Sequence, residues 1–233
     1  MGVIVLIGFT ALLHAGFQLA ISVLTLLSGH ALGRKQSHLR LLHLAGSFIW
    51  GAVVAVVALL FTALYVLSVM PFHDIFLWAV ITGIGVGSGI VVLLFYWRPS
   101  DGSRLWLPKA FADYLYDRTR KTRSGAEAFG LGIISIVSEL PFTLAPLLIT
   151  AMLLRGAPDL INFFVIAGYA VVATLPLILI FLLLGSGLKV SRIQKWRENN
   201  RRFAQITSGL GLMIISLYLF VVACLARIEV PTL

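Results

Sequence analysis

Long apolar stretches alternate with shorter polar ones along the whole chain. Six apolar runs are long enough for a helix to cross the hydrocarbon layer of a membrane, which takes about 20 residues for roughly 30 Å. Because the runs are continuous rather than short and alternating, they predict helices and exclude a strand barrel. The six predicted spans are residues 3–27, 41–69, 75–97, 129–154, 161–185 and 206–226.

Composition agrees with this pattern, since 60% of the 233 residues are hydrophobic and only 12% are charged. Such values lie outside the range of soluble domains and indicate a protein that crosses the membrane several times. The first run follows no basic residue and is longer than a secretory signal core, so we expect a retained helix. We therefore predict an all-α integral membrane protein with six transmembrane helices.

The net charge of +9 comes from an uneven distribution of Lys and Arg. Of these 18 residues, all except Arg155 and Arg227 fall in the first, third and fifth predicted loops. The positive-inside rule then places these loops in the cytoplasm and both termini outside. The basic loops favour anionic lipid headgroups as partners, and we expect no nucleic-acid partner.

The third loop is the longest polar stretch, residues 98–127, and it divides the spans three and three. Phe111, Tyr114 and Leu115 lie there at helical spacing near basic residues, which predicts a short interfacial helix. We predict three segments: a first three-helix repeat over 1–97, this cytoplasmic loop over 98–127, and a second repeat over 128–233.

A shift of 125 residues aligns the two halves and sets His14 on Glu139. Three spans per half give the copies opposite orientations in the membrane, so the chain predicts an inverted repeat. In transporters built this way, the substrate site lies near mid-depth between the repeats, where helices are broken. Identical residues at this shift are Phe17, Leu19 and Ala20, which fall on Phe142, Leu144 and Ala145.

His14 and Glu139 are also the ionisable residues that lie within the predicted spans around this axis. A charged side chain in hydrocarbon costs about 2.5–3.5 kcal/mol on insertion scales, so such residues usually face a partner, a cavity or a transport path. Polar neighbours and helix-distorting residues complete the predicted substrate or ion site: Gln18, Thr143, Gly16, Pro141 and Pro146.

Together these features resemble the LysE/CcdA group of membrane proteins. The resemblance lies in the three-plus-three architecture and in the motifs Gly16-Phe17 and Glu139-Leu140-Pro141-Phe142. CcdA and the related DsbD membrane domain carry a cysteine in both equivalent helices, and this chain has neither, which excludes a thiol relay. The resemblance then implies an exporter of amino acids or metal cations in an inner membrane.

Two interpretations of the pair stay open. Glu139 is either a proton or cation site or a protonated acid hydrogen-bonded to a neighbouring helix, and His14 is either its partner or an ordinary buried histidine. Two ligands are too few to predict a metal site, so the metal is unknown. We expect no cofactor and no enzymatic activity, and the sequence leaves a homodimer open.

Glycines are frequent in the third and sixth spans. A phosphate-binding loop is excluded for the third span, because no strand precedes the pattern. The spacing predicts close helix packing through four glycines of the third span and two of the sixth. They are Gly83, Gly85, Gly87 and Gly89, then Gly209 and Gly211.

We therefore expect a secondary exporter of a small cationic or zwitterionic solute or a metal cation, with Glu139 as the titrating or cation-binding group. The alternative is a membrane scaffold or assembly subunit that transports nothing and uses Glu139 as a structural polar lock. A water-accessible cavity between His14 and Glu139 would favour transport, and a dry, packed axis would favour the scaffold.

Overall fold

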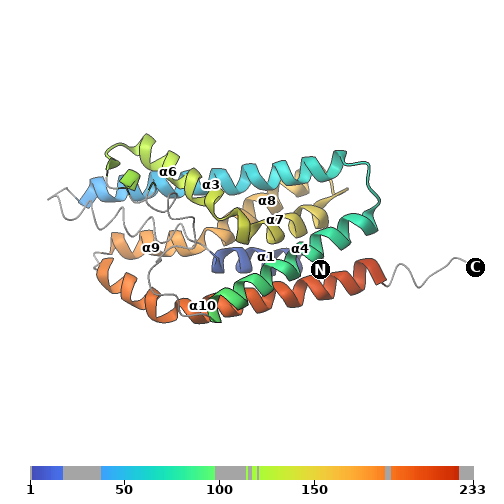
Figure 1. Ribbon diagram of the computed structural model, residues 1–233. Coiled ribbons are helices and arrows are strands. Elements are labelled where there is room, and N and C mark those ends of the chain that lie inside the picture. Colours follow the sequence, from blue (N-terminus) through green and yellow to red (C-terminus); the bar gives the residue numbers. More distant parts are fainter. Residues whose placement is uncertain are drawn as a thin grey trace, which may run out of the picture.

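A computed structural model describes residues 2–17, 38–97, 114, 117–119, 121–186 and 190–225. Every regular element in these residues is a helix, as predicted. The helices are α1 (Gly2–Gly16), α3 (His38–Val69), α4 (Asp74–Trp97), α6 (Gly125–Ser138), α7 (Leu140–Leu154), α8 (Asp159–Ala173), α9 (Leu175–Gly185) and α10 (Val190–Phe220), and the π-helical turn η1 (Val221–Leu225) follows α10 (Figure 1).

Within the described residues, three helices are long and apolar enough to cross a membrane, and two bent helix pairs raise this number to five if each pair is one span. The chain is therefore a multi-pass membrane protein. The unbroken spans are His38–Val69, Asp74–Leu94 and Ile206–Leu225. Of the predicted span 3–27, only the short apolar helix α1 lies within the described residues.

The predicted spans 129–154 and 161–185 are each divided into two helices. The break in the first span lies beside Pro141, where the sequence predicts a distorted helix, whereas the break in the second span was not predicted. The pair α6 and α7 bends by 79°, and the pair α8 and α9 bends by 55°. Both breaks follow one pattern, a buried polar residue followed by Leu and Pro: Glu139-Leu140-Pro141 and Thr174-Leu175-Pro176.

Proline explains the position of each break. It lacks a backbone N–H and its ring clashes with the preceding helical turn, but it is tolerated in the first turn of a helix. Pro141 and Pro176 both occupy the first turn of the helix that restarts, α7 and α9 respectively. The preceding helix therefore ends, and the new one starts in a different direction.

Close helix contacts at glycines hold two helix pairs together. In the α3–α6 pair, Gly51 faces the backbone carbonyl of Phe129, and Gly132 faces that of Phe48. In the α4–α10 pair, a Cβ atom at Gly89 would lie 2.9 Å from the carbonyl oxygen of Gly209. Small residues let helix backbones approach this closely in membranes.

The glycine prediction is therefore confirmed at some positions and wrong at others. Gly85, Gly89, Gly209 and Gly211 lie against neighbouring atoms, whereas nothing lies within 4 Å of a Cβ built on Gly83 or Gly87. The wrong positions belong to the other face of α4, which spacing alone could not distinguish.

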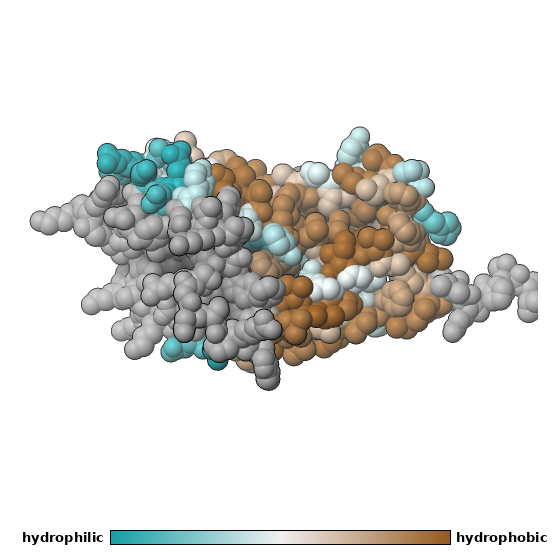
Figure 2. All heavy atoms as spheres, viewed as in Figure 1, coloured by the Kyte–Doolittle hydropathy of each residue, from teal (hydrophilic) through white to brown (hydrophobic). Residues whose placement is uncertain are grey.

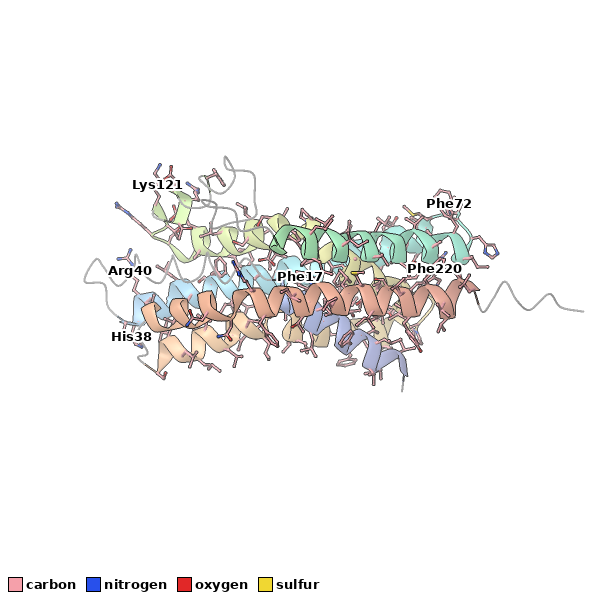
Figure 3. The ribbon with its side chains drawn as sticks, turned by 60° about the horizontal axis from the view of Figure 1, so that its bottom comes forward. Phe17, His38, Arg40, Phe72, Lys121 and Phe220 are labelled. Atoms are coloured by element: carbon pink, nitrogen blue, oxygen red, sulfur yellow. The ribbon has the colours of Figure 1, made fainter. Side chains whose placement is uncertain are left out.

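The two ends of the bundle differ in character. His38, Arg40 and Lys121 lie at one end, Phe72 lies at the other, and Phe17 lies between them (Figure 3). On the face that Figure 2 shows, apolar residues cover most of the described surface away from the end with His38, Arg40 and Lys121. The Phe72 end holds Asp74, whose carboxylate pairs with Arg155 at 2.6 Å. Arg155 thus lies opposite the cationic end, as the charge distribution predicts.

Candidate functional site

Glu139 lies at the corner between α6 and α7 and has no solvent exposure. Its backbone N–H donates to the carbonyl of Ile136 at 3.0 Å. Its own carbonyl accepts from the backbone N–H of Phe142 at 2.9 Å and from that of Thr143 at 3.0 Å. These bonds link the end of α6 to the start of α7 across the break, where Glu139 is the only acid of the predicted spans.

His14 lies in α1 and is also fully buried. Ile7, Thr10, Ala11 and His14 are buried at positions i, i+3, i+4 and i+7, so they lie on one face of the helix, and Leu13 beside them is buried as well. The ring of His14 packs edge to face with Tyr169 of α8, with centroids 5.7 Å apart. Its Nδ1 atom and the Tyr169 hydroxyl are hydrogen-bonded at 3.0 Å.

A second buried hydrogen bond joins α1 to α7. The hydroxyl of Thr150 in α7 lies 2.9 Å from that of Thr10, which precedes His14 by four residues in α1. The Thr10 hydroxyl donates to the carbonyl of Ile7 at 2.8 Å. The side chains of both pairs are buried, so one hydrogen bond joins α1 to α8 and another joins α1 to α7 in the interior.

The two halves meet at a pair of aromatic rings. Phe17 follows α1 and Phe142 lies in the first turn of α7, and their rings stack with centroids 6.3 Å apart and an angle of 22°. The two residues correspond under the shift of 125 residues. Phe17 lies between the two ends of the bundle (Figure 3), so the contact is at intermediate depth.

Other predicted site residues lie along α7 and at the end of α1. Thr143 is buried one turn after Glu139, and its hydroxyl donates to the Glu139 carbonyl at 3.2 Å. Pro146 is buried inside α7, whereas Pro141 is exposed in its first turn. Gly16 is the last residue of α1. Gln18 lies outside the described residues.

A direct hydrogen bond between His14 and Glu139 is not formed. Nδ1 of His14 bonds Tyr169, and Nε2 has no hydrogen-bond partner among the described residues. Among the residues that the structure describes, no group of three or more His, Cys, Asp or Glu residues could hold a metal ion.

Sequence reasoning missed Tyr169, Thr150 and Thr10 as members of the site. Thr10 precedes His14 by four residues, so helical spacing alone could have placed both on one face. Tyr169 and Thr150 carry no such signal, because their role depends on how α7 and α8 pack against α1.

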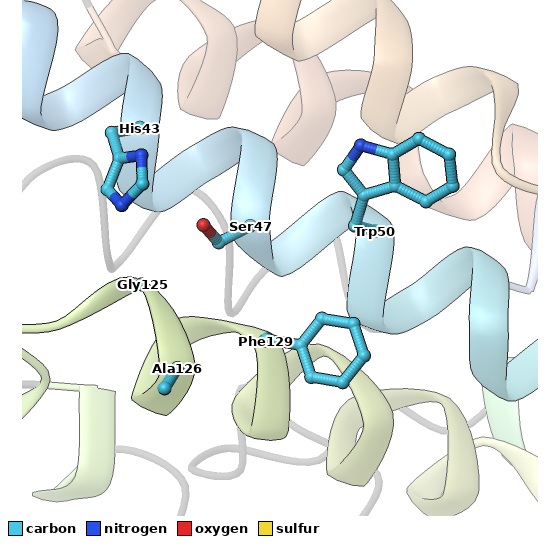
Figure 4. Close-up of a pocket in the computed structure, with 6 residues that line it drawn as sticks. All are labelled: His43, Ser47, Trp50, Gly125, Ala126 and Phe129. Carbon is cyan, nitrogen blue, oxygen red and sulfur yellow. The ribbon is translucent and has the colours of Figure 1, made fainter.

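An open groove of about 520 Å³ lies elsewhere, between α3 and α6 (Figure 4). Nε2 of His43 would lie 2.6 Å from a Cβ at Gly125, so the His43 side chain packs closely against this residue. The groove shares no residue with the candidate site, and its lining consists of His43, Ser47, Trp50, Gly125, Ala126 and Phe129.

Comparisons of the chain with protein-family models, with curated proteins and with solved structures find no match.

Proposed function

We propose that this protein is a secondary transporter in an inner membrane that exports a small cationic or zwitterionic solute or a metal cation. In this proposal the chain has six spans in a 3+3 inverted repeat, with both termini outside. Glu139 binds the cation or exchanges a proton, and His14 lies on the other side of the repeat axis.

One observation carries the proposal: a fully buried carboxyl group occupies the corner of a broken membrane helix. A carboxyl side chain inside a membrane protein is costly, so such residues usually mark a functional site. Broken helices are tolerated in membranes where they are covered by protein or line a cavity, and transporters use such breaks to bind substrate.

The helix contacts support the inverted repeat. In a three-plus-three arrangement, α1 corresponds to α6–α7, α3 to α8–α9, and α4 to α10. Contacts between corresponding elements are present for all three sets, as α1 with α7, α3 with α8 and α9, and α4 with α10. The Phe17–Phe142 stack is such a contact at the level of single residues, which favours a pseudo-two-fold axis there. The likeness to the LysE/CcdA group is part of this proposal.

The test is cation-dependent proton movement in vesicles that contain the purified full chain and a pH-sensitive dye. The probes are L-lysine, L-alanine, Zn²⁺ and Mn²⁺, each offered as an outward gradient at several pH values. We expect the wild type to move protons with at least one probe, and Glu139→Gln to abolish this movement.

Glu127→Gln is the matched control, because Glu127 is an exposed acid at the start of α6, the helix that ends at Glu139. This variant should transport like the wild type. Full and pH-dependent transport by Glu139→Gln would overturn the proposal, as would a wild-type chain that moves none of the probes.

A second candidate function is a membrane scaffold that transports nothing. The observation in its favour is that His14 and Glu139 both have no solvent exposure, while the open groove lies between other residues. A scaffold predicts that Glu139→Gln changes the free energy of unfolding and leaves vesicle proton fluxes at background for both proteins.

A further inference from the structure

The groove between α3 and α6 runs along the two helices from a polar end to an aromatic end. His43, Ser47 and Trp50 lie on one face of α3, because they are four and three residues apart. In Figure 4, His43 and Gly125 lie near one end of the groove. Trp50 and Phe129 lie near the other end. Trp50 is 66% exposed, so this end opens on the outer surface of the bundle.

Close backbone contact limits the groove at its aromatic end. A Cβ atom at Gly51 would lie against the backbone carbonyl of Phe129, so α3 and α6 touch there. Nearer the polar end, a Cβ atom at Gly125 would lie 2.6 Å from Nε2 of His43 and 2.9 Å from Oγ of Ser47. The groove is therefore bounded by helix backbone at one end and lined by two polar side chains of α3 at the other.

Two arginines lie just beyond the polar end, one from each side of the groove. Arg40 precedes His43 by three residues in α3, and an Nη atom of Arg40 donates to the backbone carbonyl of Arg123 at 3.1 Å. Arg123 precedes Gly125 by two residues, and both arginine side chains are exposed. This contact places the two arginines at the same end of the groove.

The charge of this end is positive. Glu127 is engaged by the backbone, since its carboxylate accepts from the N–H of Arg123 at 2.7 Å and from that of Ser124 at 3.3 Å, as part of the capping box of α6. Among the described residues of segments 38–43 and 114–127, the Lys and Arg residues outnumber the acids: Arg40, Arg118, Lys121 and Arg123 against Asp117 and Glu127. Arg40 and Lys121 lie at the same end of the bundle (Figure 3).

The levels of these groups match those of a phospholipid in one leaflet. Arg40 and Arg123 lie just outside the apolar runs 41–69 and 129–154, where lipid headgroups lie. From Arg40 to Trp50, α3 rises about 15 Å at roughly 1.5 Å per residue. This is about half of the roughly 30 Å of hydrocarbon in a bilayer, and thus the depth of one leaflet.

We propose that this groove binds an anionic phospholipid such as phosphatidylglycerol. Arg40 and Arg123 hold its phosphate, because guanidinium groups form charge-assisted hydrogen bonds with phosphate oxygens. One acyl chain lies along the groove against Trp50 and Phe129. The site is separate from Glu139 and does not depend on the proposed transport function.

The polar side chains between these ends fit the middle of the same lipid. His43 and Ser47 both have hydrogen-bonding atoms, and they lie between the arginines and the aromatic rings, as the glycerol esters lie between phosphate and acyl chains. A second copy of the chain fits the groove less well. Both copies would have the same orientation in the membrane, so their cationic ends would lie at the same level and repel each other.

The first test is native mass spectrometry of the full chain, purified in detergent and titrated with phosphatidylglycerol or with phosphatidylcholine of the same acyl chains. We expect the first phosphatidylglycerol to bind about 25-fold more tightly, because each of two arginines contributes about fivefold to the affinity for an anionic lipid. Equal affinities for the two lipids would overturn the inference. A dimer that holds no lipid would also overturn it and assign the groove to a second copy.

Arg40→Gln and Arg123→Gln should each weaken phosphatidylglycerol binding by about fivefold and leave phosphatidylcholine binding unchanged. Arg202→Gln is the matched control, because Arg202 is an exposed arginine of α10, which lies away from α3 and α6 (Figure 1). This variant should bind phosphatidylglycerol like the wild type. An equal loss in all three variants would indicate a general effect of charge and overturn the site.

The second test locates the acyl chain by tryptophan fluorescence in phosphatidylcholine vesicles that contain the full chain. Phosphatidylglycerol with brominated acyl chains is included at a low mole fraction, and brominated phosphatidylcholine at the same fraction measures quenching by lipid without a preference. We expect stronger quenching by the brominated phosphatidylglycerol, and we expect Trp50→Phe to remove the excess. Trp78→Phe is the matched control and should keep it, because Trp78 is only 7% exposed. An excess that persists in Trp50→Phe would overturn the inference.

Discussion

Replacing Gly132 with alanine should destabilise the protein through the contact between α3 and α6. A Cβ at Gly132 would lie against the backbone carbonyl oxygen of Phe48, closer than the 3.0 Å below which something must shift. No side-chain rotation can relieve a clash with backbone. The two helices would have to separate by about an ångström at this point, and neighbouring side chains would lose contacts.

Two opposing effects set how much Gly132→Ala lowers the free energy of unfolding. Overpacking a well-packed contact costs about 1–3 kcal/mol. Alanine is a better helix former than glycine by about 1 kcal/mol, which offsets part of this cost. Gly130→Ala in the same helix is the matched control, because nothing lies within 4 Å of a Cβ at that position. Both variants gain the same helix propensity, so the difference between their free energies of unfolding is the overpacking cost at Gly132.

The assay is reversible unfolding in mixed micelles, with increasing SDS and far-ultraviolet circular dichroism as the readout. We expect the free energy of unfolding of Gly132→Ala to be about 1–3 kcal/mol below that of Gly130→Ala. Equal stability of the two variants would refute the close backbone approach of α3 and α6.

Three other changes test separate features by the same unfolding measurement. Ser124→Ala removes the side chain that caps α6 and should cost about 1 kcal/mol, whereas Ser124→Gly should cost only a few tenths. Arg155→Ala breaks an ion pair with Asp74 that is partly exposed, so the loss should stay below about 1 kcal/mol and shrink at high salt. Leu60→Ala leaves a cavity at a side chain with no exposure and should cost about 2–5 kcal/mol, well above Val54→Ala at a position 43% exposed.

The positions of several spans could be predicted because hydrophobic length is a local property of the chain. The predicted runs 41–69 and 75–97 match α3 and α4 to within three residues at each end. The predicted span 206–226 matches the apolar span Ile206–Leu225, although α10 itself begins earlier, at Val190. Polar residues there continue the helix beyond the apolar run, and a search for apolar residues cannot detect that.

The breaks were only partly predictable. Pro141 and Pro146 were expected to distort α7, but the full break occurs at Glu139, and Pro146 lies inside a continuing helix. The equivalent break at Thr174 was missed, although Leu175-Pro176 repeats the Leu140-Pro141 pattern. A proline ends a helix only where neighbouring elements satisfy the exposed backbone, which depends on tertiary packing.

The sequence predicted which residues of the candidate site are buried but not which residues they contact. His14 and Glu139 are both buried, as expected for ionisable residues within spans. The partner of His14 turned out to be Tyr169, which lies 155 positions away in the chain. Periodicity can show which face of α1 is buried, but it cannot show which helix covers that face.

The two helix breaks bear on the order in which the chain can assemble during synthesis. An uncovered break in hydrocarbon leaves backbone groups without partners, at a cost of several kcal/mol each. Helix α7, which follows the break at Glu139, contacts α1, α3 and α4. At the break at Thr174, α8 contacts α1 and α3, and α9 contacts α3. All of these covering helices precede the break that they cover. Each bend can therefore form as soon as its segment enters the membrane, without waiting for α10.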